Sequence, residues 1–357
     1  MITFRWIATF LLAIYCSILA VHNLKIGAFN AAVFGQQKAR KQRVLGIIAK
    51  IAVCYDILLL QEVRDATETA VNKLLNRIKK DFGVNFDLVS SERLGRSHSK
   101  EQYVFLYRKD RGIDVTSSYH YDDGDESFKN DTFEREPFIV KFRAENSEVA
   151  DFALVAIHIK PKKAYEELKA LNDVYLDVKN RLSRNIIILG DLNADCTYMP
   201  KKYWSDIDLR QNTELWWPIG DDMDTTTSRT HCAYDRFIIA GRLRKAVLQE
   251  SVGIFDFATV LGLSLEEARE VSDHYPIELE LREKTARTTR SSPKCQGFRS
   301  DHYSKEIELR ENTTRTTISP PKCQDVNRGM VQKGFWSYLI ISFVVSTWYC
   351  NKMCDLV

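Results

Sequence analysis

The chain of 357 residues has no apolar run of the roughly 20 residues that a membrane-spanning helix needs. Its two longest apolar stretches, residues 6–19 and 335–350, are both shorter. It also lacks two closely spaced pairs of Cys or His residues near each other in the sequence, which a structural zinc site usually needs. Basic residues are in no large excess, since 51 Lys and Arg stand against 48 Asp and Glu. These absences disfavour a zinc-stabilised fold and a uniformly cationic protein, and they leave the two apolar stretches to be explained.

The N-terminal 23 residues have the pattern of a secretory signal peptide. They contain one charge, Arg5, followed by an apolar stretch that ends at Ala20 and by the polar residues His22 and Asn23. A basic start, a short apolar segment and small residues before a polar boundary are typical of a cleaved signal. The pattern predicts export to an oxidising compartment, and an uncleaved membrane anchor is the alternative.

The eight cysteines are spread unevenly along the chain. Cys16 leaves with the predicted signal peptide, and Cys54 lies in a predicted helix. Four more lie in the C-terminal tail: Cys295, Cys323, Cys350 and Cys354. Cys196 and Cys232 remain as a plausible disulfide of the body, because the alternative, a zinc site, would need further ligands near them.

Charge is distributed unevenly as well. Residues 282–334 contain 12 Lys or Arg and six Asp or Glu. These residues therefore carry a charge of +6, Arg5 adds +1, and residues 335–357 are neutral overall. Since the whole chain has a net charge of +3, residues 24–281 carry a charge of −4. If the body binds a polyanion such as DNA, local contacts and bound cations must offset its own negative field.

Short apolar runs that end in a polar residue recur through the body, at residues 25–30, 56–62, 103–108, 152–158 and 185–193. Such runs predict strands buried on both faces, with polar chemistry at their ends. Helical periodicity marks residues at about 36–53, 66–80 and 163–182, and residues 235–241 and 275–281 add two more strands. The body is therefore predicted to be α+β or α/β, with at least seven strands in two packed sheets and helices outside.

The last 75 residues differ in composition from the body. Residues 272–296 recur in similar form at 300–324, which we interpret as a tandem duplication of the last strand and a linker. The predicted organisation is a signal peptide at 1–23, a body at 24–282, a low-complexity basic linker at 283–334 and a hydrophobic segment at 335–357. That last segment fits a lipid-anchor signal, a short membrane span or an unstructured extension. Residues 130–132 and 312–314 are N-glycosylation acceptor triplets.

Several polar residues stand at the predicted strand ends. His158 closes one apolar run, and His274 follows Asp273 directly before another strand. A lone histidine in such a place is more often structural, but two of them occur here beside several carboxylates. Asn30, Glu62, Asp191 and Asn193 end the remaining runs. Hydrolysis of a phosphodiester needs a base, an acid and positive charge on the phosphate, and these residues could supply the first two and hold a cation.

Motifs around these residues occur in a fixed order, at 26–30, 60–65, 94–96, 100–101, 135–137, 157–158, 190–196, 232–236 and 272–276. In this combination the sequence resembles the deoxyribonuclease I family, within the wider endonuclease–exonuclease–phosphatase superfamily. The resemblance covers residues 24–282, which is nearly the whole body. It implies an α+β fold of four layers, in which two mainly antiparallel sheets pack together and helices flank them.

The resemblance implies a secreted, divalent-metal-dependent endodeoxyribonuclease that leaves 5′-phosphate ends. Glu101 would orient His158 and Asp235 would orient His274, with one histidine acting as base and the other as acid. Mg²⁺ or Mn²⁺ and the scissile phosphate would be held by Asn30, Glu62, Asp191, Asn193 and Asp273. Contacts to DNA are expected from Arg64, Arg135 and Tyr198.

Two structural Ca²⁺ sites are also implied. The first would use Asp224, Thr226, Ser228 and Thr230, which alternate along a hydroxyl-rich segment before Cys232. The second would use Asp131, Glu136 and the backbone carbonyl of Phe133. Ordinary polar loops are the alternative interpretation of both segments.

The sequence departs from the family at several positions. Asp125 and Phe128 stand where the family has a short-loop disulfide, Ser99 replaces a groove-inserting tyrosine, and Ala32 replaces a phosphate-binding arginine. Leu88, Ser90 and Phe138 occupy the actin-binding positions and differ from the actin-sensitive members, so we expect the enzyme to escape inhibition by actin. A monomer is expected as well. The alternatives are a phosphoesterase for lipid or inositol phosphates and a catalytically silent binding protein.

Of the two Asp-His-Tyr motifs, only the one with His274 precedes a predicted strand, so His302 is expected to be dispensable.

Overall fold

The computed structural model describes residues 23–124 and 131–284. The predicted signal peptide, apart from Asn23, lies outside the described residues, as do the linker beyond Lys284, His302, the hydrophobic C-terminal segment and both glycosylation asparagines. Asp125 and Phe128 also lie outside them. Within the described part of the chain, no helix is both long and apolar enough to cross a membrane.

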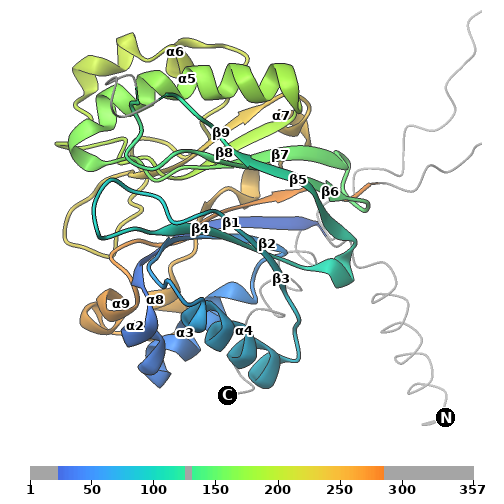
Figure 1. The fold of residues 1–357 in the computed structure, drawn as a ribbon, viewed down its shortest axis with the longest axis vertical. Helices are drawn as coiled ribbons and strands as arrows, with labels where there is room; N and C mark the ends of the chain where they lie inside the picture. Colours follow the sequence, from blue (N-terminus) through green and yellow to red (C-terminus); the bar gives the residue numbers. More distant parts are fainter. Residues whose placement is uncertain (1–22, 125–130, 285–357) are drawn as a thin grey trace, which may run out of the picture. The chain divides into compact units, whose positions relative to one another are not determined.

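Two β-sheets form the centre of the body (Figure 1). The six-stranded sheet has the order β10-β11-β1-β2-β4-β3, and the five-stranded sheet has the order β5-β6-β7-β8-β9. The first comprises β1 (Leu24–Phe34), β2 (Ile57–Val63), β3 (Asp87–Ser90), β4 (Gln102–Tyr107), β10 (Gly253–Ile254) and β11 (Ile277–Leu281). The second comprises β5 (Ile113–His120), β6 (Phe138–Ala144), β7 (Asp151–Ala156), β8 (Ile186–Asp191) and β9 (Asp235–Ala240). The pairs β1/β2 and β7/β8 are parallel and the others are antiparallel, as the predicted fold class requires.

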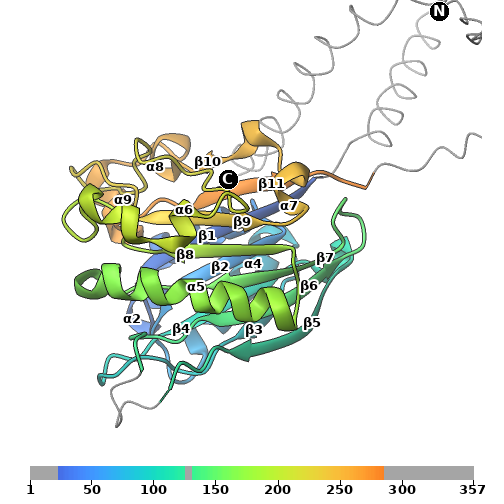
Figure 2. The same ribbon diagram turned by 90° about the horizontal axis from the view of Figure 1, so that it is seen from above.

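Helices cover the outer face of each sheet (Figures 1 and 2). Those beside the six-stranded sheet are α2 (Gln36–Arg40), α3 (Gln42–Ala52), α4 (Thr69–Phe82), α8 (Phe257–Val260) and α9 (Leu265–Val271). The five-stranded sheet is covered by α5 (Ala164–Arg181) and α6 (Asp208–Gln211), while α7 (Leu243–Ala246) follows β9. Short 3₁₀ turns lie at Lys109–Arg111, Pro161–Lys163, Lys201–Asp206 and Gln249–Ser251. The predicted four-layer sandwich is confirmed.

The central strands are apolar on both faces because each face packs against a different layer. In β8, Ile187 and Leu189 face the core between the sheets, whereas Ile186 and Ile188 face the core beneath α5. In β1, Ile26 and Ala28 face the core between the sheets. Successive side chains of a strand point to opposite faces of the sheet, so a strand that is buried on both faces has a continuous apolar sequence.

The structure corrects the predicted elements in three respects. It contains β3, β5, β6 and β10, which the apolar runs did not reveal. It divides the predicted helix at 36–53 into α2 and α3, because Lys41 between them has an extended backbone with φ −72° and ψ 95°. Cys54 follows the end of α3 and does not lie within it.

Candidate active site

A bulge between β1 and β2 shapes the end of the six-stranded sheet. Between Asn30 and Phe34, β1 has three residues opposite the single residue Glu62 of β2. Ala32, Val33 and Glu62 all have left-handed backbones, with φ of 43°, 57° and 55°. A β-branched residue with positive φ is strained, and such strain persists only where the surroundings enforce it. Bulges redirect side chains, and here the backbone N–H groups of Ala32 and Val33 donate to Asn30 Oδ1 and Glu62 Oε2, both at 3.0 Å.

His158 lies two residues beyond β7, and Glu101 orients its ring. Glu101 Oε1 is 2.6 Å from His158 Nδ1. The backbone N–H of His158 donates to the hydroxyl of Tyr103 at 2.8 Å, which fixes the main chain as well. Because a carboxylate at Nδ1 favours the tautomer with hydrogen on that nitrogen, Nε2 is left to face the site. The predicted Glu101–His158 pair is present.

His274 has an equivalent arrangement on the other side of the site. Its Nδ1 is 2.8 Å from Oδ2 of Asp235, the first residue of β9, and Asp235 is fully buried. The backbone N–H of His274 donates to Ser272 Oγ at 3.0 Å. The predicted Asp235–His274 pair is therefore present too.

Asp191 lies between the two histidines. Its Oδ2 is 3.4 Å from His158 Nε2, 3.6 Å from His274 Nε2 and 3.2 Å from Asn30 Nδ2. Asn30 Nδ2 also donates to Glu62 Oε1 at 3.3 Å. Residues from both sheets thus converge on one carboxylate.

Local backbone geometry brings Asp191 to this point. Gly190 has φ +132°, and a Cβ there would lie 2.4 Å from the carbonyl of Ile157 and 2.6 Å from Gln61 Nε2, so only glycine fits. The fully buried Gln61 joins the sheets, because it donates to Ile157 O at 2.8 Å and accepts from the N–H of Asp191 at 3.0 Å. Gln61 was not among the predicted site residues.

The electrostatics of the two pairs follow from burial and nearby charges. Burial raises the pKa of Glu101, but His158, Arg135 and Arg64 outweigh it and lower the pKa to about 2. Burial lowers the pKa of His274, but the carboxylates of Asp235, Asp191 and Asp273 together raise it well above its usual value. Glu101 therefore stays ionised, and His274 holds a proton readily.

The donor set of the site fits a hard divalent cation. Asp191 and Asp235 are directly opposite each other on β8 and β9, an arrangement of like charges that is costly without compensation. Asp191, Asp235 and His274 offer ligand atoms that all lie within 4.8 Å of one another, and Asp235 Oδ1 is buried with no hydrogen-bond partner in the described residues. Carboxylate and amide oxygens are the ligands that Mg²⁺ and Mn²⁺ take in proteins. With Asn30 and Glu62 beside it, Asp191 is well placed to hold such an ion.

Asn193 and Asp273, which were predicted to hold the metal ion and the phosphate, do not contact Asp191 through their side chains in the way that Asn30 does. Asn193 has φ 47° and is buried, and its Nδ2 donates to Ile159 O at 3.0 Å. Asp273 is exposed, and its carboxylate makes no hydrogen bond within the described residues. Asp273 therefore lies at the rim of the site.

The three predicted DNA contacts differ in how accessible they are. Arg64 Nη2 lies 2.9 Å from Glu62 Oε2 and 3.3 Å from Glu101 Oε2. The largely buried Arg135 holds the carbonyl of His158 at 2.9 Å and Glu101 Oε1 at 3.0 Å through Nε. Tyr198 is 40% exposed, with its ring 5.4 Å from that of Tyr234, which is itself 6.3 Å from the His274 ring. Both arginines thus stabilise the site internally, and only Tyr198 presents an open face.

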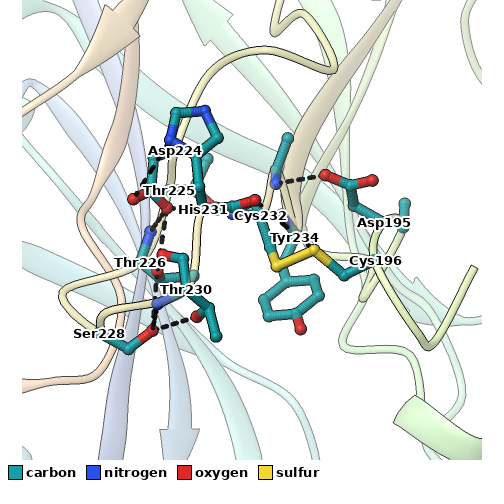
Figure 3. The surroundings of a disulfide bond; sticks show 12 residues. Asp195, Cys196, Asp224, Thr225, Thr226, Ser228, Thr230, His231, Cys232 and Tyr234 are labelled. Carbon is teal, nitrogen blue, oxygen red and sulfur yellow. Dashed lines mark hydrogen bonds and ion pairs between the residues drawn. A yellow bond between two sulfur atoms is a disulfide. The ribbon is translucent and has the colours of Figure 1, made fainter.

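The hydroxyl-rich segment before Cys232 gathers its oxygen atoms at one point (Figure 3). Thr226 Oγ1 lies 2.9 Å from Asp224 Oδ1, 3.1 Å from Ser228 Oγ and 3.0 Å from Thr230 O, and the hydroxyls of Ser228 and Thr230 are in contact. The disulfide Cys196–Cys232, which the sequence predicted, closes the segment. Clustered oxygens of this kind suit Ca²⁺.

The second predicted calcium site is arranged differently. Arg96 Nη2 donates to Asp131 Oδ1 at 2.6 Å and to Phe133 O at 2.8 Å, which are the oxygens expected to bind the ion. Burial raises the pKa of Glu136, and the nearby carboxylates of Asp131 and Asp123 raise it further. The acidic groups do gather, but a cation would have to displace the guanidinium of Arg96.

Sequence reasoning missed three residues whose hydrogen bonds hold segments of the site: Lys38, Gln61 and Ser272. Each is a polar residue in or beside an element whose apolar pattern indicated only structure. The available signal was a polar residue at a position predicted to be buried, as for Gln61 within β2. Their partners could not be identified from the sequence, because the contacts span up to 242 positions.

The chain is similar in sequence and in fold to known proteins. The model of the endonuclease/exonuclease/phosphatase family matches residues 27–274. Deoxyribonuclease-1 of Sus scrofa is 45% identical over 262 residues, covering 73% of this chain and 92% of the relative, and that of Canis lupus familiaris is 46% identical over 261 residues, covering 72% and 92%. A solved structure of D. rerio TDP2 humanized by 14 mutations shares the fold, with a TM-score of 0.51, 15% identity, and coverage of 73% of this chain and 99% of that one.

Proposed function

The chain belongs to the deoxyribonuclease I family, within the endonuclease/exonuclease/phosphatase family, and on that basis we propose that it is a metal-dependent endonuclease that hydrolyses DNA. One observation carries the proposal. Two histidines, each held at Nδ1 by a buried carboxylate, direct Nε2 toward the same oxygen of Asp191. That arrangement supplies two separate proton-transfer groups around one anionic centre, as phosphodiester hydrolysis requires.

In the proposed reaction, one histidine takes a proton from water through Nε2 as the water oxygen attacks phosphorus. The bond from phosphorus to O3′ then breaks, and the other histidine gives its Nε2 proton to that oxygen. The products are a 3′ hydroxyl and a 5′ phosphate.

The carboxylates at Nδ1 keep both histidines ready for this chemistry. Glu101, itself held by Arg135 and Arg64, fixes the tautomer of His158, and Asp235 does the same for His274. Asn30, Glu62 and Asp191 would hold Mg²⁺ or Mn²⁺, with Asn193 and Asp273 nearby. A bound ion would supply positive charge to the non-bridging phosphate oxygens. Tyr198 would face the DNA at the edge of the site.

We further propose that Ca²⁺ stabilises the fold at the oxygen cluster of Asp224, Thr226, Ser228 and Thr230. Asp131, Glu136 and the carbonyl of Phe133 form a second, weaker site, because Arg96 already contacts two of these groups.

The N-terminal sequence supports secretion, and the hydrophobic residues 335–357 could attach the protein to a membrane. Leu88, Ser90 and Phe138 support an enzyme that escapes actin, and potent inhibition of plasmid nicking by monomeric actin would contradict this. We also propose that the protein is a monomer.

The decisive experiment incubates purified protein with supercoiled plasmid, with and without Mg²⁺ and Ca²⁺. His158→Ala and His274→Ala are compared with the wild type, and His302→Ala serves as a matched control. Each catalytic variant should lose about a hundred- to ten-thousand-fold in rate, while the control keeps full activity. Metal-independent nicking, or full activity in either catalytic variant, would overturn the mechanism.

Parallel assays with inositol phosphates and phospholipids test the nearest alternative. A phosphoesterase of that class should release phosphate from these substrates and leave the plasmid intact. A silent binding protein should do neither, although it would still retain the plasmid on a filter.

A further inference from the structure

Lys38 lies on α2, outside the set of residues assigned to catalysis, yet all its donors point toward the site. Its ammonium donates to the carbonyl oxygens of Ala31 at 2.9 Å, Val271 at 2.9 Å, and Ala32. An ammonium has three N–H donors, so these contacts satisfy the group completely. The side chain is only half-buried and could have extended into solvent.

Two of the three carbonyls belong to the bulge of β1. The N–H groups of Ala32 and Val33 hold Asn30 Oδ1 and Glu62 Oε2, and both residues have left-handed backbones. A strained bulge keeps this shape only if other contacts enforce it. Lys38 binds the carbonyls of the same peptide segment whose N–H groups orient the metal-side residues.

The third carbonyl belongs to Val271, the last residue of α9. The next residue, Ser272, donates through Oγ to Asn30 O at 2.6 Å and accepts from the backbone N–H of His274 at 3.0 Å. Lys38 and Ser272 thus join the same two segments, one of which carries Asn30 and the other His274. These segments are more than 230 residues apart along the chain.

We propose that Lys38 is a positioning residue. It fixes the bulge of β1 against the end of α9 and so holds Asn30 and Glu62 in the correct position relative to His274. The inference rests on the proposed function, since it names what aligns the metal side of that site with one of its proton-transfer groups. The charge of Lys38 also interacts favourably with Asp273 and Glu62.

Only a lysine meets this geometry. The three carbonyls surround one point, which suits the compact ammonium of lysine with its three divergent donors at the end of a flexible stem. The planar guanidinium of arginine presents its donors in a flat fork instead. Lys38→Arg should therefore keep the charge and lose part of the alignment. Lys38→Met should lose both while retaining much of the apolar stem.

The first measurement does not depend on activity. In metal-free protein, amide hydrogen exchange at Ala32 and Val33 should speed up about tenfold or more in Lys38→Met, because the hydrogen bonds of the bulge open more often. Lys41→Met is the matched control, since the side chain of Lys41 is exposed and, within the described residues, makes one ion pair, of 4.0 Å with Glu270. Exchange in the control should match the wild type.

The second measurement uses plasmid nicking at a series of Mg²⁺ concentrations. In Lys38→Met, kcat should fall by about tenfold to a hundredfold, as expected for a misplacement of about 1 Å, and more Mg²⁺ should be needed. The KM for DNA should change little. Lys38→Arg should be intermediate, and Ser272→Ala should give the same pattern in milder form.

Three results would overturn the proposal. The first is wild-type exchange and kcat in folded Lys38→Met. The second is a lower Mg²⁺ requirement with kcat intact, which would show that Lys38 only repels the ion. The third applies if Lys38→Met does not fold. In that case, a wild-type value of kcat in Lys38→Arg would overturn the proposal. Wild-type protein that fails to cut DNA would contradict the proposed function instead, and the exchange experiment would still test the positioning role.

Discussion

His158 Nε2 lies 3.4 Å from Oδ2 of Asp191. That same oxygen is 3.6 Å from His274 Nε2 and accepts a hydrogen bond from Asn30 Nδ2 at 3.2 Å. One carboxylate oxygen therefore contacts both histidines that we propose as proton-transfer groups and Asn30, which we propose as a metal ligand. Asp191 is also the last residue of β8, so its position is set by the sheet and not by a mobile loop.

The role of Asp191 predicts the effect of an isosteric change. Asp191→Asn keeps the shape of the side chain but removes the charge that both histidines and a cation face. We expect nicking to fall by about a hundred- to ten-thousand-fold. Calorimetric titration with Mn²⁺ should also show weaker binding. Asp206→Asn, on an exposed turn, is the control, and wild-type metal affinity in Asp191→Asn would contradict the assignment.

Glu101→Gln tests the orientation of His158. The amide cannot carry the negative charge that Arg135 and Arg64 hold, and it can donate to Nδ1 and favour the wrong tautomer. kcat should fall by about a hundredfold or more while the KM for DNA stays near the wild-type value. Glu92→Gln, at an exposed position, should have no effect. A variant that changed only KM would place Glu101 in DNA binding instead.

Glu167 predicts a pH dependence of stability. This fully buried carboxyl on α5 accepts from the N–H groups of Glu134 at 3.3 Å and Lys160 at 3.4 Å. Burial raises its pKa to about 7, even though Arg135, the two N–H groups and Lys163 act to lower it. Above pH 4.5 the unfolded carboxyl loses its proton while the folded one keeps it, so the native state binds more protons.

The stabilising contribution of Glu167 is therefore complete below about pH 4.5 and is lost as pH rises through about 7. Glu167→Gln cannot ionise, so its stability relative to the wild type should improve by about 2 kcal/mol between pH 5 and pH 8. Urea unfolding at both pH values measures this. Glu166→Gln removes the same charge from the exposed neighbour and should show no such trend. An equal difference at both pH values would contradict the raised pKa.

Calcium should stabilise the protein mainly through the cluster at Asp224. Saturating Ca²⁺, at about a hundred times the dissociation constant, would add about 2.7 kcal/mol to the free energy of unfolding. Asp224→Asn should abolish most of the rise in melting temperature on Ca²⁺ addition. Asp131→Asn should abolish less, because Arg96 competes at that site. The reverse order would show that the guanidinium is readily displaced.

Strand ends and motifs predicted from the sequence which residues the structure brings together in the candidate site. Asn30, Glu62, Asp191 and His158 follow or end apolar runs, and neighbouring strand ends meet at one edge of a sandwich. The resemblance supplied the pairing of each histidine with its carboxylate, and the structure has both pairs. In contrast, β5 escaped notice because half of its eight residues are exposed and polar, which leaves little apolar pattern to detect.

The sequence by itself determined the layers, the polar residues at the strand ends and the order of the motifs, because each depends on residues near one another along the chain. Only the tertiary structure decided which of these residues meet. Ser272 reaches Asn30 across 242 positions, Gln61 joins β2 to the loop after β7, and Lys38 binds carbonyls of β1 and α9. Periodicity carries no information about such contacts, because they arise from the packing of whole sheets and helices.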